Sequence, residues 1–290
     1  MVDPDTLAYL DHLQWLRTGS RAAQYLHCSQ SQISRRANKC LSIFNLTLKR
    51  VSSEWCLVGD DFLLGRERRV HQHYRWTTDR QLRFDCQSWL RDSYSSLPLD
   101  GWTKGNLNYL EYARPLSLLR DRIIDVWLCS APDHPRDSDL TSFQLCSMPS
   151  YLVVRNCHPL IDLGPSVTLD DVRRYPVLPL PMGAFPVFES VLESLGLHSN
   201  DRRLYSESSL PVEDLLVGIA SPLTIAQYGN DYVVLPCRLP VTVGDVLVVR
   251  SDFACHPRTQ DLLGDLLNHL REVTSGLDDV EVHREAMVLS

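Results

Sequence analysis

The sequence predicts an α/β protein with an all-α N-terminal domain. From Gln81 onward, short strand-like runs alternate with helical segments, which is typical of a largely parallel sheet covered by helices. Before that point, three helical patterns fill the first 44 residues. The chain has 290 residues, enough for two or three compact units.

Composition indicates an ordinary globular chain, with 44% hydrophobic and 22% charged residues. The N-terminus carries aspartates where a secretory signal needs basic residues, and no later run approaches the roughly 20 apolar residues that span a bilayer. Nine cysteines, an odd number without a C-x-x-C pair, fit free thiols in a reducing compartment. We therefore expect a cytoplasmic protein with no membrane contact and no metal site.

Charge is unevenly distributed along the chain. Residues 1–50 hold seven Lys or Arg against three Asp, a net charge of +4. Residues 94–290 hold 15 Lys or Arg against 26 Asp or Glu, a net charge of −11. A basic head on an acidic body is expected where only the head meets a polyanion.

The first two helices are short and closely packed. Leucines recur at every third residue of the first, which ends near Thr18-Gly19: they are Leu7, Leu10, Leu13 and Leu16. The second turns Ala22, Ala23 and Leu26 inward, and such small side chains let two helices cross closely.

A third helix begins at Ser29, which can cap the backbone while Gln32 reaches back in a capping box. Its apolar stripe consists of Ile33, Ala37, Cys40 and Phe44. The opposite arc consists of Ser31, Ser34, Arg35 and Asn38. Side chains of these lengths reach base edges and phosphates in a major groove, although a solvated helix face is the plainer alternative.

A hairpin predicted over residues 45–59 carries Lys49 and Arg50, as a wing that touches phosphates would. The helices and this hairpin together predict a winged helix-turn-helix that binds duplex DNA. The expected readers of base edges or phosphates are Gln30, Ser31, Ser34 and Arg35, with Lys49 and Arg50 on the backbone.

The run "GSRAAQYLHCSQSQISRR", followed by "LKR", resembles the winged helix-turn-helix of LysR-type transcriptional regulators. The matching residues are Ser20, Ala22, Ala23, Leu26, Ser29, Gln30, Ser34, Arg35 and Arg50. The sequence departs from the family pattern at Ser31, where proline is frequent, and the downstream Leu-Glu and Leu-Phe pairs are replaced by "CL" and "TL". With later segments included, the resemblance covers about 270 residues.

The resemblance implies three parts: a head (residues 1–58), a linker helix (59–79) and an effector-binding domain (80–290). In the linker, Leu63, Val70, Tyr74 and Thr77 occupy positions that would face the partner helix in a coiled coil. An ordinary exposed connector is the alternative. The family further implies a homodimer or homotetramer.

Eight strand-like runs are predicted in the body, at residues 81–87, 105–112, 123–129, 150–156, 175–180, 202–208, 232–236 and 245–251. A last helix is predicted at 257–272, and the C-terminal segment beyond it is acidic and uninformative. We expect two α/β subdomains, approximately residues 80–160 with 250–290, and 161–249. The resemblance implies that they are arranged like those of periplasmic binding proteins.

In such folds ligands bind where strands end and helices begin. The candidate effector-binding residues at these places are Gln87, Ser88, Arg114, Met182, Gly183 and Ser206. Arg114 is the fixed cation among them, which favours an anionic effector such as a carboxylate. Simple helix capping is the alternative for each serine.

Enzymatic activity is not expected, because the chain has no H-E-x-x-H, G-x-S-x-G or phosphate-loop motif, and no cofactor is predicted. A redox sensor built on Cys146 and Cys157 is a second alternative, although buried cysteine is usually inert. The sequence thus predicts a sequence-specific regulator that responds to a small-molecule effector. The alternative is a sensor of the same fold, with lost or altered DNA binding, that acts through protein partners.

Overall fold

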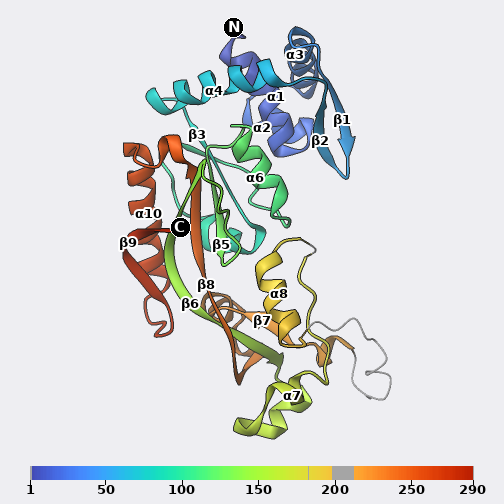
Figure 1. Ribbon diagram of the computed structural model, residues 1–290, viewed down its shortest axis with the longest axis vertical. Coiled ribbons are helices and arrows are strands. Elements are labelled where there is room, and N and C mark those ends of the chain that lie inside the picture. Colours follow the sequence, from blue (N-terminus) through green and yellow to red (C-terminus); the bar gives the residue numbers. More distant parts are fainter. Residues whose placement is uncertain (1, 182, 198–211, 290) are drawn as a thin grey trace. The chain divides into compact units, whose positions relative to one another are not determined.

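The computed structural model describes residues 2–181, 183–197 and 212–289 (Figure 1). The chain divides into two compact units. Unit 1 comprises the residues up to Tyr109 together with Ala113–Leu128 and Val249–Thr259, and unit 2 comprises Leu110–Tyr112, Cys129–Val248 and Gln260–Ser290. This division by packing differs from the predicted three-part division, which concerns function and stays a prediction.

Unit 1 begins with three helices and a two-stranded antiparallel hairpin, as predicted. Their bounds are α1 Pro4–Leu16, α2 Gly19–Tyr25, α3 Gln30–Ile43, β1 Thr47–Val51 and β2 Glu54–Val58. Side chains of Asp3, Thr18 and Ser29 cap the three helices, and the predicted capping box between Ser29 and Gln32 is present.

The leucine stripe of α1 is buried, as are Ala22 and Ala23 of α2. The apolar stripe of α3 packs against them through Ile33, Ala37 and Cys40, each at most 1% exposed. These small and apolar side chains account for the close packing of the three helices.

Helix α4, Phe62–Thr77, follows the hairpin and has one buried face. That face is largely polar, since Arg68, His71, Gln72 and Arg75 are buried beside Leu64 and Trp76. Trp76 stacks on Phe253, with ring centroids 4.6 Å apart. The predicted seam residues Leu63, Val70, Tyr74 and Thr77 are all exposed.

The sheet in unit 1 is parallel. Strand β3, Leu82–Cys86, pairs with β4, Trp102–Lys104, on one side and with β5, Val126–Ala131, on the other. Helix α6, Ala113–Arg120, lies between β4 and β5 in sequence, and the short α5, Arg91–Tyr94, follows β3.

The prediction of a strand over residues 105–112 is wrong, because this segment forms only an isolated bridge between Gln87 and Tyr109. Leu107 has a positive φ of 49°, and its backbone N–H donates to the Asp85 carboxylate at 3.1 Å. A strand that turns in this way to satisfy a buried carboxylate cannot continue along the sheet.

Unit 2 is built on two long strands that lie side by side, β6, Leu140–Arg155, and β8, Tyr232–Arg250. Strands β7, Gly218–Ala220, and β9, Glu281–Leu289, both pair antiparallel with β6. The remaining helices are α7 Leu169–Val172, α8 Pro186–Ser194, α9 Pro222–Tyr228 and α10 Pro257–Val273. An apolar cluster that includes Val154, Phe188 and Val217 forms the core.

Four predictions for the body need correction. The fold is mixed α/β rather than largely parallel, because β6 has antiparallel neighbours. The runs 232–236 and 245–251 fall on one strand, β8, which ends at Arg250, and 175–180 forms only a bridge from Val177 to Val217. The C-terminal segment forms β9. The run 202–208 lies outside the described residues. Within the described ranges, no helix is both long and apolar enough to cross a membrane.

Candidate nucleic-acid interface

The exposed arc of α3 is polar and cationic. Gln30, Ser31, Ser34 and Arg35 are all exposed, whereas the opposite side of the helix is buried. The side chain of Gln30 lies against Gly19 at the start of α2, since a Cβ on Gly19 would lie 2.9 Å from Gln30 Cγ. The absence of a side chain at residue 19 therefore lets the start of α3 approach α2 closely.

Two further cations on the predicted wing are also exposed. In the register of the hairpin Lys49 lies opposite Cys56, and Arg50 lies opposite Trp55. The Arg50 guanidinium is 5.7 Å from the centre of the Trp55 ring, which orients it without burying its charge. Unit 1 thus contains all six predicted DNA-binding residues, and every one of them is exposed.

Arg36 and Lys39 extend the cationic surface of α3. Arg36 lies over the Tyr9 ring at 5.0 Å, so α1 orients this side chain. Among the described residues, no carboxylate lies within ion-pair distance of Arg35, Lys49 or Arg50. Cations that no carboxylate neutralises remain available to phosphates.

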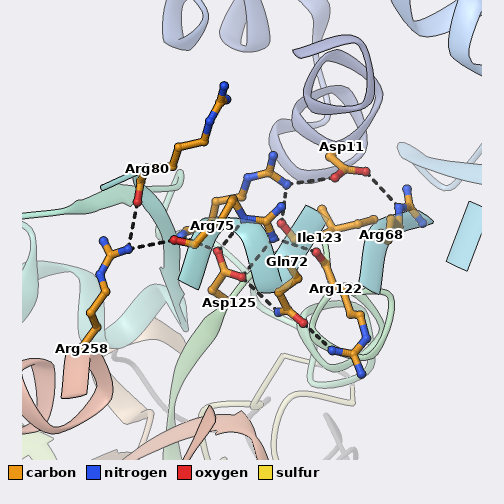
Figure 2. Close-up of polar contacts among 10 residues, drawn as sticks. Asp11, Arg68, Gln72, Arg75, Arg80, Arg122, Ile123, Asp125 and Arg258 are labelled. Carbon is orange, nitrogen blue, oxygen red and sulfur yellow. Dashed lines mark hydrogen bonds and ion pairs between the residues drawn. The ribbon is translucent and has the colours of Figure 1, made fainter. Parts of the chain in front are cut away.

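Beneath this surface lies a buried network of ion pairs and hydrogen bonds (Figure 2). Asp11 of α1, 1% exposed, accepts from Arg68 Nε of α4 at 2.9 Å and from Arg83 Nη1 of β3 at 3.1 Å. Burial alone would raise the pKa of Asp11, but the Arg68 and Arg83 guanidiniums hold it below its ordinary value.

A second carboxylate, Asp125, completes the network. It accepts from Arg75 Nη2 at 3.0 Å, from Gln72 Nε2 at 3.0 Å and from the backbone N–H of Arg83 at 2.9 Å. Arg122 donates to Gln72 Oε1 at 2.6 Å (Figure 2). Arg83 therefore links the two carboxylates and, with them, α1, α4 and β3. Buried charges joined in this way fix one arrangement of the three elements.

A third carboxylate, Asp85, lies at the carboxyl end of β3. Trp15 Nε1 of α1 donates to Asp85 Oδ2 at 2.6 Å, and the backbone N–H groups of Cys86 and Leu107 donate to Oδ1. Burial raises the pKa of Asp85 to about 7, although the three N–H donors favour its charged form. Sequence reasoning did not single out Trp15 or Asp85.

Three of the predicted effector residues, Gln87, Ser88 and Arg114, belong to unit 1. Gln87 is buried, and its backbone forms a bridge with Tyr109. The Ser88 N–H donates to the Tyr109 carbonyl at 3.0 Å. Arg114 is engaged with the head: its Nε lies 3.0 Å from Glu54 Oε2, so an anionic ligand would compete with this carboxylate. The effector-binding role of Arg114 stays a prediction.

Gly183, a further predicted effector residue, belongs to unit 2. Gly183 is exposed, has a positive φ of 70°, and accepts from the Tyr112 N–H at 3.1 Å. Met182 and Ser206 lie outside the described residues.

Unit 2 also has an apolar groove of about 840 Å³ that sequence reasoning missed. It is lined by β8, α9 and the segment before β9, and Val233 and Val234 on its wall are 36% and 40% exposed. At one end, Tyr151 donates to Asp279 at 2.5 Å, and Arg238 lies 3.6 Å from the same carboxylate. Exposed apolar surface of this kind is typical of contact sites.

The cysteines offer little support for a thiol switch. Burial raises the pKa of the Cys146 thiol well above its ordinary value, which disfavours the reactive thiolate. Cys157 is exposed, and neither residue forms a disulfide. In the part of the chain that the structure describes, no three His, Cys, Asp or Glu side chains are grouped as metal ligands.

Comparison with known proteins identifies one family. The protein-family model described as "LysR substrate binding domain" matches residues 106–271 of this chain. No curated protein matches the chain. Several solved structures resemble it. A full-length OxyR variant from Pseudomonas aeruginosa is 16% identical, with a TM-score of 0.57 over 93% of this chain and 95% of that chain.

A probable transcriptional regulator, also from Pseudomonas aeruginosa, is 14% identical, with a TM-score of 0.51 over 96% of this chain and 98% of that chain. A hydrogen peroxide-bound OxyR variant from Corynebacterium glutamicum is 14% identical, with a TM-score of 0.50 over 94% of this chain and 96% of that chain. At these identities the structural likeness concerns the fold alone.

Proposed function

This chain belongs to the LysR-type family of transcriptional regulators and carries an effector-binding domain, and from that premise we propose that it binds duplex DNA sequence-specifically. The head, residues 1–58, acts as a winged helix-turn-helix. The observation that carries the proposal is the exposed polar and cationic arc of α3, opposite its buried apolar stripe.

In this proposal α3 enters the major groove. Gln30, Ser31, Ser34 and Arg35 read base edges or nearby phosphates, since their lengths and hydrogen-bonding groups suit that groove. Lys49 and Arg50 of the wing contact the backbone, which adds affinity without sequence preference. The positive charge of the first 50 residues supports this orientation toward a polyanion.

The effector domain, residues 80–290, binds a small molecule that shifts the population of its conformations. Gln87, Ser88 and Gly183 are candidate contacts, together with Met182 and Ser206. Arg114 takes part if an anionic ligand displaces Glu54 from it.

Two separate apolar surfaces support a homodimer or homotetramer. On α4, in the linker part 59–79, Phe62, Leu63, Val70 and Tyr74 are 45–64% exposed. In unit 2, the apolar groove is a second such surface. Two self-complementary surfaces per chain suffice to build a dimer of dimers.

The test is selection of bound duplexes from a random DNA pool, followed by measurement of Kd by fluorescence anisotropy. Arg35→Ala should weaken binding to the selected duplex about 10- to 100-fold and relax its sequence preference. Arg174→Ala, which alters an exposed arginine of unit 2, is the matched control and should leave Kd unchanged. Failure of the wild-type chain to enrich any sequence would favour the sensor that acts through protein partners.

A further inference from the structure

The last turn of α1 is capped by side chains from outside the head. A helix leaves its final carbonyls without intrahelical partners. In unit 1 three successive carbonyls of α1 accept from a single later segment. Arg114 Nη2 donates to the Gln14 carbonyl at 3.2 Å, Tyr109 Oη to that of Trp15 at 2.6 Å, and Asn106 Nδ2 to that of Leu16 at 3.4 Å. The donors lie within residues 105–114, most of which belong to the match with the LysR substrate binding domain.

The same segment packs tightly against α1. Gly105 has no room for a side chain, because a Cβ there would lie 2.1 Å from Asp85 Oδ2 and 2.8 Å from Trp15 Cζ2. Trp15 is fully buried and donates to Asp85. Tyr25 of α2 donates to the Gly105 carbonyl at 3.2 Å. Both α1 and α2 of the head therefore contact this segment through buried or partly buried hydrogen bonds.

Arg114 also holds the wing. Its Nη2 donates to the Trp55 carbonyl of β2 at 3.3 Å, and its Nε pairs with Glu54. Glu54 pairs with Arg17 as well, and Trp55 Nε1 donates to the Arg17 carbonyl at 2.9 Å. One guanidinium at the start of α6 thus contacts both the end of α1 and the start of β2.

On its other side, the segment contacts a candidate effector residue. Tyr109 accepts from the Ser88 N–H through its carbonyl and donates to Trp15 through its hydroxyl. The residue therefore joins the end of β3 to the head. A ligand that moves the backbone at Ser88 would move this tyrosine, and with it the last turn of α1.

We propose that residues 105–114 couple the effector domain directly to the DNA-binding head, with Tyr109 and Arg114 as the positioning residues. This inference rests on the proposed function. Through these contacts, a change at the effector site reaches α1 and the wing without first displacing α4. We call the contacts of Asn106, Tyr109 and Arg114 with the head the clasp.

The first test is hydrogen exchange on the full chain. Tyr109→Phe removes a hydroxyl without changing the shape of the side chain, and Arg114→Gln removes the charge. Each should speed exchange at the end of α1 about tenfold, and Arg114→Gln should do the same in β2, while exchange in β6 stays unchanged. Tyr175→Phe, in a tyrosine of unit 2 that contacts His158, is the control and should alter neither α1 nor β2. Unchanged exchange in both clasp variants would overturn the inference.

The second test is DNA binding. On a duplex selected by the wild-type chain, Arg114→Gln should change Kd at least threefold although it lies outside the head, and Arg114→Lys, which keeps the charge, should restore part of the change. If Arg114→Gln does not fold, Glu54→Gln removes the same ion pair from the other side. Equal Kd in all variants contradicts the clasp while leaving the proposed function intact. If the wild-type chain binds no DNA, the proposed function fails, and the exchange experiment still decides the clasp.

Discussion

The arginines on the surface of the head, residues 1–58, differ in their surroundings from the buried arginines of the network around Asp11 and Asp125. Arg35 and Arg50 are exposed and have no carboxylate partner among the described residues. Arg68, Arg75 and Arg83 are at most 8% exposed and are tied to Asp11 and Asp125. A buried arginine therefore needs a carboxylate partner and serves the architecture of the fold, whereas an exposed arginine needs none and stays available for the proposed contacts with DNA.

The largest effect is expected at Asp11. Asp11→Ala leaves Arg68 and Arg83 buried without this carboxylate, so the free energy of unfolding should fall by about 3–5 kcal/mol. Denaturant unfolding measures the loss. Asp5→Ala removes the partner of Arg80 from a pair whose side chains are 46% and 63% exposed, and it should cost less than about 1 kcal/mol. Equal losses of unfolding free energy in the two variants would show that the buried ion pairs contribute no more to stability than the exposed one.

The next effect depends on pH and concerns Asp85. Its folded pKa of about 7 exceeds the ordinary value of 3.8, so between these values the folded chain binds a proton that the unfolded chain lacks. Asp85 therefore contributes stability that is complete below pH 4 and is lost as pH rises to 7, by up to about 4 kcal/mol.

Asp85→Asn removes this dependence. Its stability relative to wild type should rise between pH 4 and 7 and level off above pH 7. Burial lowers the pKa of His12 to about 3, which gives the wild-type chain an opposite slope below pH 6.5. Thermal unfolding of both chains across pH 4–8 cancels the His12 contribution in the difference. A difference that stays flat with pH would show that Asp85 remains charged throughout.

A third prediction concerns the exposed layer. Arg50→Ala should weaken binding to selected and unselected duplexes alike, and it should lower the slope of log Kd against log salt concentration by about 1. Its free energy of unfolding should change by no more than about 1 kcal/mol, because the side chain is exposed and its only stabilising contact in the described residues is the one with the Trp55 ring. A loss that depended on sequence would place this arginine among the base readers.

The head was the most predictable part of the chain, because its signals are local. The leucine period, the capping box at Ser29 and the polar arc of α3 each depend on neighbouring residues only, and the structure contains all three features. The exposure of Gln30, Ser31, Ser34 and Arg35 follows from helical geometry in the same way.

The junction beneath the head was not predictable from sequence alone. Arg68, Gln72 and Arg75 lie on one face of α4, but a stripe of polar residues is normally solvated. Their carboxylate partners lie about 50 residues or more away, at Asp11 and Asp125. The bend at Leu107 has the same origin, since the distant Trp15 and Asp85 determine it. The predicted strand at 81–87 is confirmed as β3. The conformation of 105–112 depends on these distant contacts, so the strand predicted there is wrong.

A small effect on stability is expected at Arg36 of α3. It is exposed like Arg35, yet its guanidinium lies over the Tyr9 ring. A cation–π contact at an exposed site is worth about 0.5–1 kcal/mol, so Arg36→Ala should lower the free energy of unfolding by that amount. Arg36→Lys should retain part of the stability and most of the affinity for DNA, since it keeps the charge but not the planar stack. Denaturant unfolding with and without Tyr9→Leu checks the origin of the loss. If Arg36→Ala lowers the free energy of unfolding as much in the Tyr9→Leu background, the contact with the Tyr9 ring contributes nothing to stability.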